Sequence, residues 1–133
     1  MLDFHLDRRS GLPTYLQLAR QVEQALRLGM LKPGDQLPTA KEVVGQLAIN
    51  PNTVHKAYRE LDRMGLVEAR PGRGTFVLRG LGGTAAERRP ELRDELVRWI
   101  DAAFVGGMEP ADIHALFDAV MRARLNPREE GPE

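Results

Sequence analysis

The sequence contains no cysteine, few aromatic residues and no long hydrophobic run. Without cysteine there is no disulfide and no thiolate metal site, so a reducing compartment, the cytoplasm, is the expected location. No apolar stretch approaches the roughly 20 residues that a membrane-spanning helix needs, and residues 1–10 do not resemble a signal peptide. A chain of 133 residues can form one compact domain with an appendage or two small domains. It is too short for a barrel or a doubly wound enzyme fold.

The sequence also lacks an excess of charge of either sign, because 19 basic residues balance 19 acidic ones. This balance on its own argues against a nucleic-acid-binding protein. The charges are unevenly distributed, however. Residues 1–80 carry twelve basic and eight acidic side chains, whereas residues 81–133 carry seven basic and eleven acidic ones. Such a difference indicates two roles, one of which faces a polyanion.

Motifs typical of catalysis or of metal binding are missing as well. The sequence has no nucleophile elbow, no phosphate-binding loop and no metalloprotease motif. The three histidines, His5, His55 and His114, lie far apart in the sequence. Asp112 is close to His114, but two residues apart on a helix point about 200° away from each other. We therefore expect no enzymatic activity, no cofactor and no functional metal.

Three helices are expected within the first 65 residues. Their apolar residues recur every three or four positions, the spacing of one buried helix face. Thr39 and Glu42 form a capping-box pattern before the second helix, and Asn50 followed by Pro51 is a common start for the third. The expected boundaries are Pro13–Gly29, Ala40–Ala48 and Pro51–Gly65.

The third of these helices has an apolar face and a basic face. The apolar residues, which we expect to be buried, are Val54, Ala57, Tyr58, Leu61 and Met64. The opposite face carries Asn52, His55, Lys56, Arg59 and Arg63. A basic helix face is often only a solvated surface, so its role depends on the elements around it.

A hairpin and a flexible joint follow the third helix. Residues 66–70 and 75–78 are expected to form two strands around a tight turn that contains glycine. Glycines at positions 80, 82 and 83 indicate a joint, so we divide the chain into a domain at residues 1–80 and a segment at residues 81–133. That segment is expected to hold two helices, which begin near Pro90 and Pro110, and a frayed end at residues 127–133.

Three helices followed by a hairpin are typical of a winged helix-turn-helix, so the expected fold class is mainly α with a small β-hairpin. The run LPTAKEVVGQLAINPNTVHKAYRELDRMGLVEARPGRGTFV, at residues 37–77, resembles the DNA-binding signature of GntR-type bacterial transcription regulators. The preceding PTYLQLARQVEQALRLGMLKPGDQ resembles the first helix and connecting turn of the same domain. The short two-helix tail is similar to the YtrA-like subfamily.

The resemblance implies a dimeric transcription regulator, expected to repress its own operon by binding a palindromic operator in double-stranded DNA. YtrA-like regulators often control a neighbouring operon that encodes an ATP-driven transporter. The expected DNA contacts lie at the starts of the second and third helices, along the third helix and on the hairpin. They are Thr39, Lys41, Asn50, Asn52, Thr53, His55, Lys56, Arg59, Arg70, Gly72, Arg73 and Gly74. For Lys41, Gly72 and Gly74 the role is implied by the resemblance: a basic contact and a close backbone approach to the minor groove.

Two departures from the family pattern affect base recognition. Many members carry Ser or Thr followed by Arg where this chain has Asn50 and Pro51, and Arg where it has His55. Pro51 has no backbone donor, and histidine makes one bond where arginine can make two with guanine. We expect base reading to shift to Asn52, His55, Lys56 and Arg59. A competing interpretation of Arg70 is an ion pair with Glu68 or Glu60.

The C-terminal segment is expected to form a dimer. Two helices with many large hydrophobic residues cannot bury them alone, and they are too few to enclose a ligand pocket. A second copy of the chain is the commonest partner. The candidate interface residues are Leu96, Trp99, Ile100, Phe104, Leu116, Phe117 and Val120. Two alternatives stay open: an effector-responsive switch at the dimer interface, and a winged-helix module that binds an acidic protein.

Overall fold

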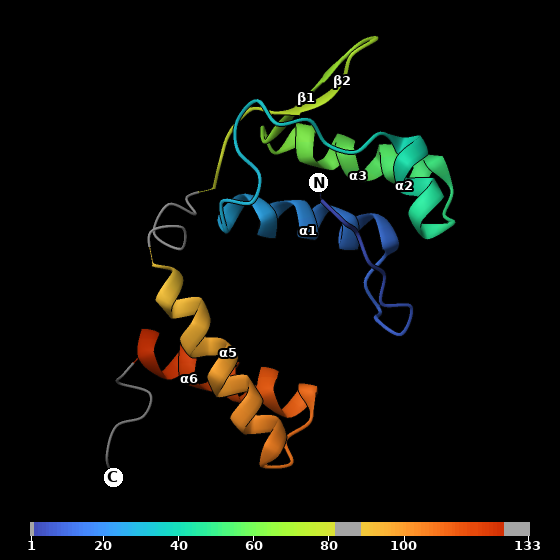
Figure 1. Cartoon of the computed structure of the whole chain (residues 1–133). Helices are drawn as coiled ribbons and strands as arrows, with labels where there is room; N and C mark the ends of the chain where they lie inside the picture. The colour runs from blue at the N-terminus through green and yellow to red at the C-terminus, as the bar shows by residue number, and fades with distance from the viewer. Residues whose placement is uncertain (1, 82–88, 127–133) are drawn as a thin grey trace. The chain divides into compact units, whose positions relative to one another are not determined.

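The computed structural model describes residues 2–81 and 89–126, which belong to two compact units, residues 1–88 and 89–133 (Figure 1). The elements of the first unit are α1 (Thr14–Arg27), α2 (Ala40–Leu47), α3 (Pro51–Arg63), β1 (Val67–Arg70) and β2 (Gly74–Val77). The second unit holds α5 (Pro90–Val105) and α6 (Pro110–Leu125). The predicted fold class, mainly α with one small antiparallel sheet, is confirmed. The expected joint at Gly82 and Gly83, and the end at 127–133, lie outside the described residues.

The starts of α2 and α3 are fixed by the capping residues that the sequence predicts. Thr39 Oγ1 accepts a hydrogen bond from the Glu42 amide at 3.1 Å, and the Glu42 carboxylate accepts one from the Thr39 amide at 3.0 Å. Asn50 Oδ1 accepts a hydrogen bond from the Asn52 amide at 2.8 Å. The start of α1 differs from its prediction: Pro13 precedes the helix, because its ψ of 145° is extended and only its carbonyl joins the helix. The three helices also end one or two residues before their expected ends.

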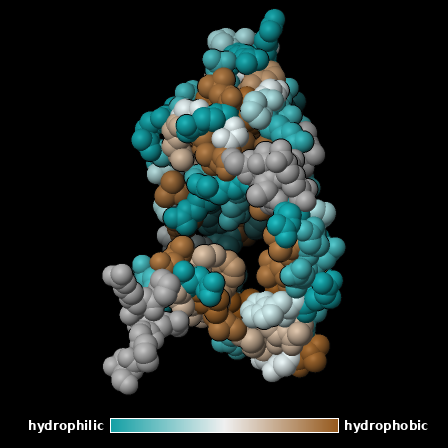
Figure 2. Space-filling view, turned by 90° about the vertical axis from the view of Figure 1, so that its left-hand side faces the viewer, coloured by the Kyte–Doolittle hydropathy of each residue, from teal (hydrophilic) through white to brown (hydrophobic). Residues whose placement is uncertain are grey.

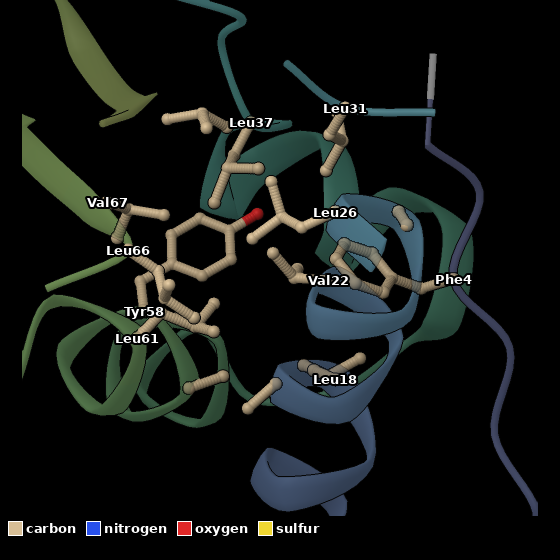
Figure 3. Packing of buried hydrophobic residues seen from close by; sticks show 14 of the residues in the cluster. Phe4, Leu18, Val22, Leu26, Leu31, Leu37, Tyr58, Leu61, Leu66 and Val67 are labelled. Carbon is tan, nitrogen blue, oxygen red and sulfur yellow. The ribbon is translucent and has the colours of Figure 1, made fainter. Parts of the chain in front are cut away.

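The core of the first unit lies between α1, α2, α3 and the base of the hairpin. Figure 3 shows Leu18, Val22 and Leu26 of α1 facing Tyr58 and Leu61 of α3. The Tyr58 ring is buried, and its hydroxyl donates a 2.6 Å hydrogen bond to the carbonyl of Pro38, the residue before the α2 cap. Burial raises the pKa of Tyr58 well above its usual range, with a smaller contribution from Glu42, so the phenol remains a donor. This bond ties the start of α2 to α3.

The hairpin differs from its prediction by one residue at each strand. Strand β1 begins at Val67 rather than at residue 66, and β2 runs from Gly74 to Val77 rather than from 75 to 78, because Gly74 pairs with Arg70. The sequence also gave no sign of a third paired segment. The Leu37 amide donates to the Thr75 carbonyl at 2.9 Å, and the Val77 amide donates to the Asp35 carbonyl at 2.8 Å. Residues 35–37, just before α2, therefore hydrogen-bond to β2 along the edge that does not pair with β1.

The second unit buries very little of its apolar surface. Among residues 89–126, only Ala103 of α5 and Ile113 of α6 are buried. Phe104, one of the candidate interface residues, is exposed, whereas the neighbouring Ala103 is buried. Neither these two helices nor any other described helix has the length and apolar character that crossing a bilayer requires.

Ala48, which ends α2, gives the first testable prediction. It has a φ of 53°, a left-handed conformation that costs an L-residue about 1–2 kcal/mol. Glycine avoids this strain but loses more entropy on folding, so Ala48→Gly is expected to raise the free energy of unfolding by about 0.5–1 kcal/mol. Urea denaturation measures the change. Ala102→Gly, inside α5, is a control with the opposite expected sign: it should lower the free energy of unfolding. An Ala48→Gly protein that is less stable than the wild type would contradict the strain at this position.

Candidate nucleic-acid interface

The exposed face of α3 presents three unengaged polar side chains. Val54, Ala57 and Leu61 are fully buried, which turns Asn52, His55 and Arg59 towards solvent. In residues 2–81 and 89–126, the side chains of these three make no hydrogen bond and no ion pair. An α-helix with free donors near its start is the element that fits a major groove about 12 Å wide.

Two cations on the same helix are already held by neighbours. The Lys56 ammonium lies 4.2 Å from the centre of the Tyr15 ring, at the start of α1. Arg63 Nε donates to Glu60 at 3.2 Å, and this bond lowers the pKa of Glu60 and raises that of Arg63. Lys56 remains exposed beside the free donors, whereas Arg63 is paired with a carboxylate.

The other predicted contacts, near the starts of α2 and α3, have different roles in the structure. The side chains of Thr39 and Asn50 cap α2 and α3, and the hydrogen bond from the Thr39 amide lowers the pKa of Glu42. Lys41 is exposed in the first turn of α2 and forms no side-chain bond within the part of the chain that the structure describes. Thr53 is half-buried. In the first turn of α2, the Ala40 and Lys41 amides have no partner among the described residues and suit an anion. The start of α3 differs, because Pro51 has no N–H and the Asn52 and Thr53 amides both bond to Asn50.

The tip of the hairpin is a turn with glycine in the required position. Pro71 and Gly72 are its central residues, Gly72 has a φ of 75°, and the Arg73 amide donates to the Arg70 carbonyl at 2.9 Å. These features are typical of a type II turn. Arg73 is exposed at the end of this turn, and its guanidinium has no partner among the described residues.

Arg70 is engaged, in agreement with the competing interpretation of its role. Its Nε donates to Glu68 at 2.9 Å, and its guanidinium lies 4.5 Å from the centre of the Phe76 ring across the hairpin. The second acid considered, Glu60, binds Arg63 instead. Arg73 is therefore the free cation of the hairpin, within the described residues.

Gln36 supports the hairpin from outside, a role that the sequence did not predict. Its Nε2 donates to the Arg73 carbonyl at 3.0 Å, and its backbone pairs with Phe76. Gly74 has a φ of 125°, and a Cβ at this position would lie 2.4 Å from Gln36 Nε2. Gly74 thus makes room for the side chain that fixes the turn. No local sequence pattern predicts this contact, because 37 residues separate Gln36 from Arg73.

Comparison with known proteins places this geometry in a family. The model of bacterial regulatory proteins of the gntR family matches residues 14–77. The HTH-type transcriptional repressor YtrA of Bacillus subtilis (strain 168) is 36% identical over 110 residues, which are 82% of this chain and 85% of YtrA. The chain belongs to the GntR family. The resemblance derived from the sequence is confirmed, and this GntR-family chain is a transcriptional regulator rather than an enzyme.

Two solved structures support the GntR fold. YtrA from Sulfolobus acidocaldarius, a GntR-family transcription factor, is similar with a TM-score of 0.54 at 32% identity, over 74% of this chain and 97% of that one. The structure of AraR(DBD) in complex with operator ORX1 is similar with a TM-score of 0.51 at 28% identity, over 57% of this chain and 95% of that one.

The contact between Gly74 and Gln36 gives the second prediction. Gly74→Ala introduces both backbone strain and a clash with the amide, so we expect the free energy of unfolding to fall by about 2 kcal/mol. The matched control is Gly72→Ala, where the added Cβ meets nothing within 4 Å and only the positive φ is penalised, by about 1 kcal/mol. Chemical denaturation of both variants measures the difference. Equal costs would show that Gln36 does not occupy this space.

Proposed function

We propose that this GntR-family regulator is a dimeric repressor that binds a palindromic operator in double-stranded DNA, controls its own operon and acts in the cytoplasm. Each copy inserts α3 into a major groove and places the tip of its hairpin on the neighbouring DNA. The observation that carries the proposal is the exposed face of α3, where Asn52, His55 and Arg59 are free. Side chains of these types bind base edges or phosphates.

The proposed DNA contacts are of two kinds, which differ in their chemistry. Asn52 can make two bonds to adenine, and His55 and Arg59 lie on the same face, so α3 carries the sequence preference. Arg73, Lys41 and the free amides at the start of α2 bind phosphate, which fixes orientation without reading sequence. The relatives support this scheme: YtrA is named a transcriptional repressor, and AraR(DBD) was solved in complex with an operator.

The helical unit supports the dimer. Six of the seven proposed interface residues are exposed, and Ile100 is half-buried. Five of the seven line one apolar hollow between the two helices: Leu96, Trp99, Leu116, Phe117 and Val120. Brown, hydrophobic surface is visible on this unit in Figure 2. A contiguous apolar surface of this kind on a small unit marks a protein interface, and a second copy satisfies it symmetrically.

The function is tested by selecting bound duplexes from a random DNA pool with the wild-type chain. We expect a two-fold symmetric consensus. Asn52→Ala should then weaken binding to the selected duplex by about 1–3 kcal/mol and leave binding to random duplex almost unchanged. Arg73→Ala should weaken both equally and reduce the dependence of log K on log salt by about one for each bound copy. Binding without any sequence preference would instead indicate a module for an acidic protein partner.

The dimer is tested by a polar substitution in the hollow. Phe117→Ser should shift the protein from dimer to monomer in sedimentation velocity, because it removes an apolar side chain from the centre of the proposed interface. Val105→Ser is the matched control, since Val105 is 90% exposed on the same unit and does not line the hollow. A Phe117→Ser protein that remains dimeric, like the control, would place the interface elsewhere.

A further inference from the structure

The segment before α1 is fastened to that helix by two glutamines. Gln21 bonds both backbone groups of His5, at 3.1 Å to the amide and 2.7 Å to the carbonyl. Gln17 does the same with Asp7, at 2.9 Å to the amide and 3.1 Å to the carbonyl. Four helical residues rise about 6 Å and two extended residues span about 6.6 Å, so glutamines one turn apart match alternate residues of an extended chain. We call residues 3–12 the N-terminal arm.

The other side of the arm packs against the core. Phe4 is buried, and Figure 3 shows its ring beside Val22 and Leu26 of α1. Leu6 is partly buried against the same cluster. Polar bonds at residues 5 and 7 and apolar contacts at 4 and 6 together hold the arm in one conformation.

The tip of the arm is a closed turn that carries two arginines. The Arg9 amide donates to Asp7 Oδ1 at 3.0 Å, and the Ser10 amide donates to the Asp7 carbonyl at 3.2 Å. Ser10 Oγ then accepts a bond from the Leu12 amide at 3.0 Å. Arg8 and Arg9 are exposed, and across residues 2–81 and 89–126 neither guanidinium has a hydrogen-bond or ion-pair partner.

This tip lies beside the joint that leads into α3. Arg8, Ser10 and Thr14 border one hollow together with Ile49, the residue before the Asn50 cap. Figure 1 shows the loop of the arm, in dark blue, at the end of α1 that is nearest α2. Two cations are therefore held near the start of the helix proposed to enter the major groove.

We propose that the tip of the arm is a further DNA-binding element, in which Arg8 and Arg9 bind phosphates beside the groove that α3 occupies. This inference rests on the proposed function. Guanidinium groups bind phosphate through paired hydrogen bonds, and a turn that is already folded loses little entropy when it binds. Contacts to phosphate add affinity without sequence preference. If the arm only covered the core, Phe4 and Leu6 would suffice and the arginines would be dispensable.

The test is the double variant Arg8→Gln/Arg9→Gln, measured by fluorescence anisotropy over a series of salt concentrations. The probes are the duplex selected by the wild-type chain and a random duplex of equal length. Loss of two phosphate contacts per copy, four in the proposed dimer, should weaken both complexes by about a hundred- to thousandfold near physiological salt and reduce the slope of log K against log salt by about 3.6. Arg8→Lys/Arg9→Lys, which keeps the charges, should recover most of the affinity.

The control removes the same two charges from the solvent-facing side of α1. Arg20→Gln/Arg27→Gln should bind both duplexes like the wild type, because these side chains are exposed on the side opposite the buried face. Thermal unfolding should show that both double variants are folded. If the Arg8→Gln/Arg9→Gln protein behaves like this control while the wild type still selects a sequence, the proposed role of the arm in DNA binding is overturned and the proposed function is not. A wild type that selects no sequence overturns the proposed function and the arm with it.

Discussion

The burial of one face of α3 determines which side chains of this helix face DNA in the proposed complex. Val54, Ala57 and Leu61 have no exposed surface, so the helix cannot rotate about its axis without moving apolar side chains into water. The Tyr58 hydrogen bond to Pro38 fixes the start of α2 relative to the same helix. A single orientation of α3 therefore sets the direction of Asn52, His55 and Arg59. It also sets the positions of two helix starts relative to one another.

What the sequence predicted correctly was local. Thr39 and Glu42, or Asn50 and Pro51, act within one helical turn, so spacing alone places the starts of α2 and α3. The apolar face of α3 follows from periodicity in the same way, except that Met64 lies past the helix end and is only partly buried. The strands were placed one residue away from their observed positions, because pairing of Gly74 with Arg70 depends on the turn rather than on apolar alternation.

What the sequence did not reveal depends on contacts between distant residues. Gln36 reaches Arg73, and Gln17 and Gln21 reach the N-terminal arm, through side-chain amides whose identity gives no hint of their partners. For Arg70 the sequence left two acids possible: Glu68 lies two residues before it on β1 and binds it, whereas Glu60 binds Arg63. Exposed pairs such as Arg70 with Glu68 contribute little to stability, so a phosphate can replace the carboxylate at small cost. Arg70 can therefore still bind a phosphate if it gives up Glu68, whereas Arg73 has no carboxylate partner to give up within the described residues.

The balanced net charge is consistent with a DNA-binding protein once the charges are located. In the proposed complex, the excess of acidic residues at 81–133 would repel the DNA backbone and limit non-specific association, which depends on the number of phosphates neutralised. Binding then requires the local cations of α2, the hairpin and the arm to act together with the α3 contacts. One helix reads only a few base pairs, so a single copy has little discrimination among genomic sites. The proposed dimer, joined through the apolar helical unit, would make the second contact intramolecular, which raises affinity for paired half-sites without adding positive charge. In this proposal, the apolar surface on α5 and α6 and the neutral overall charge both favour selective binding.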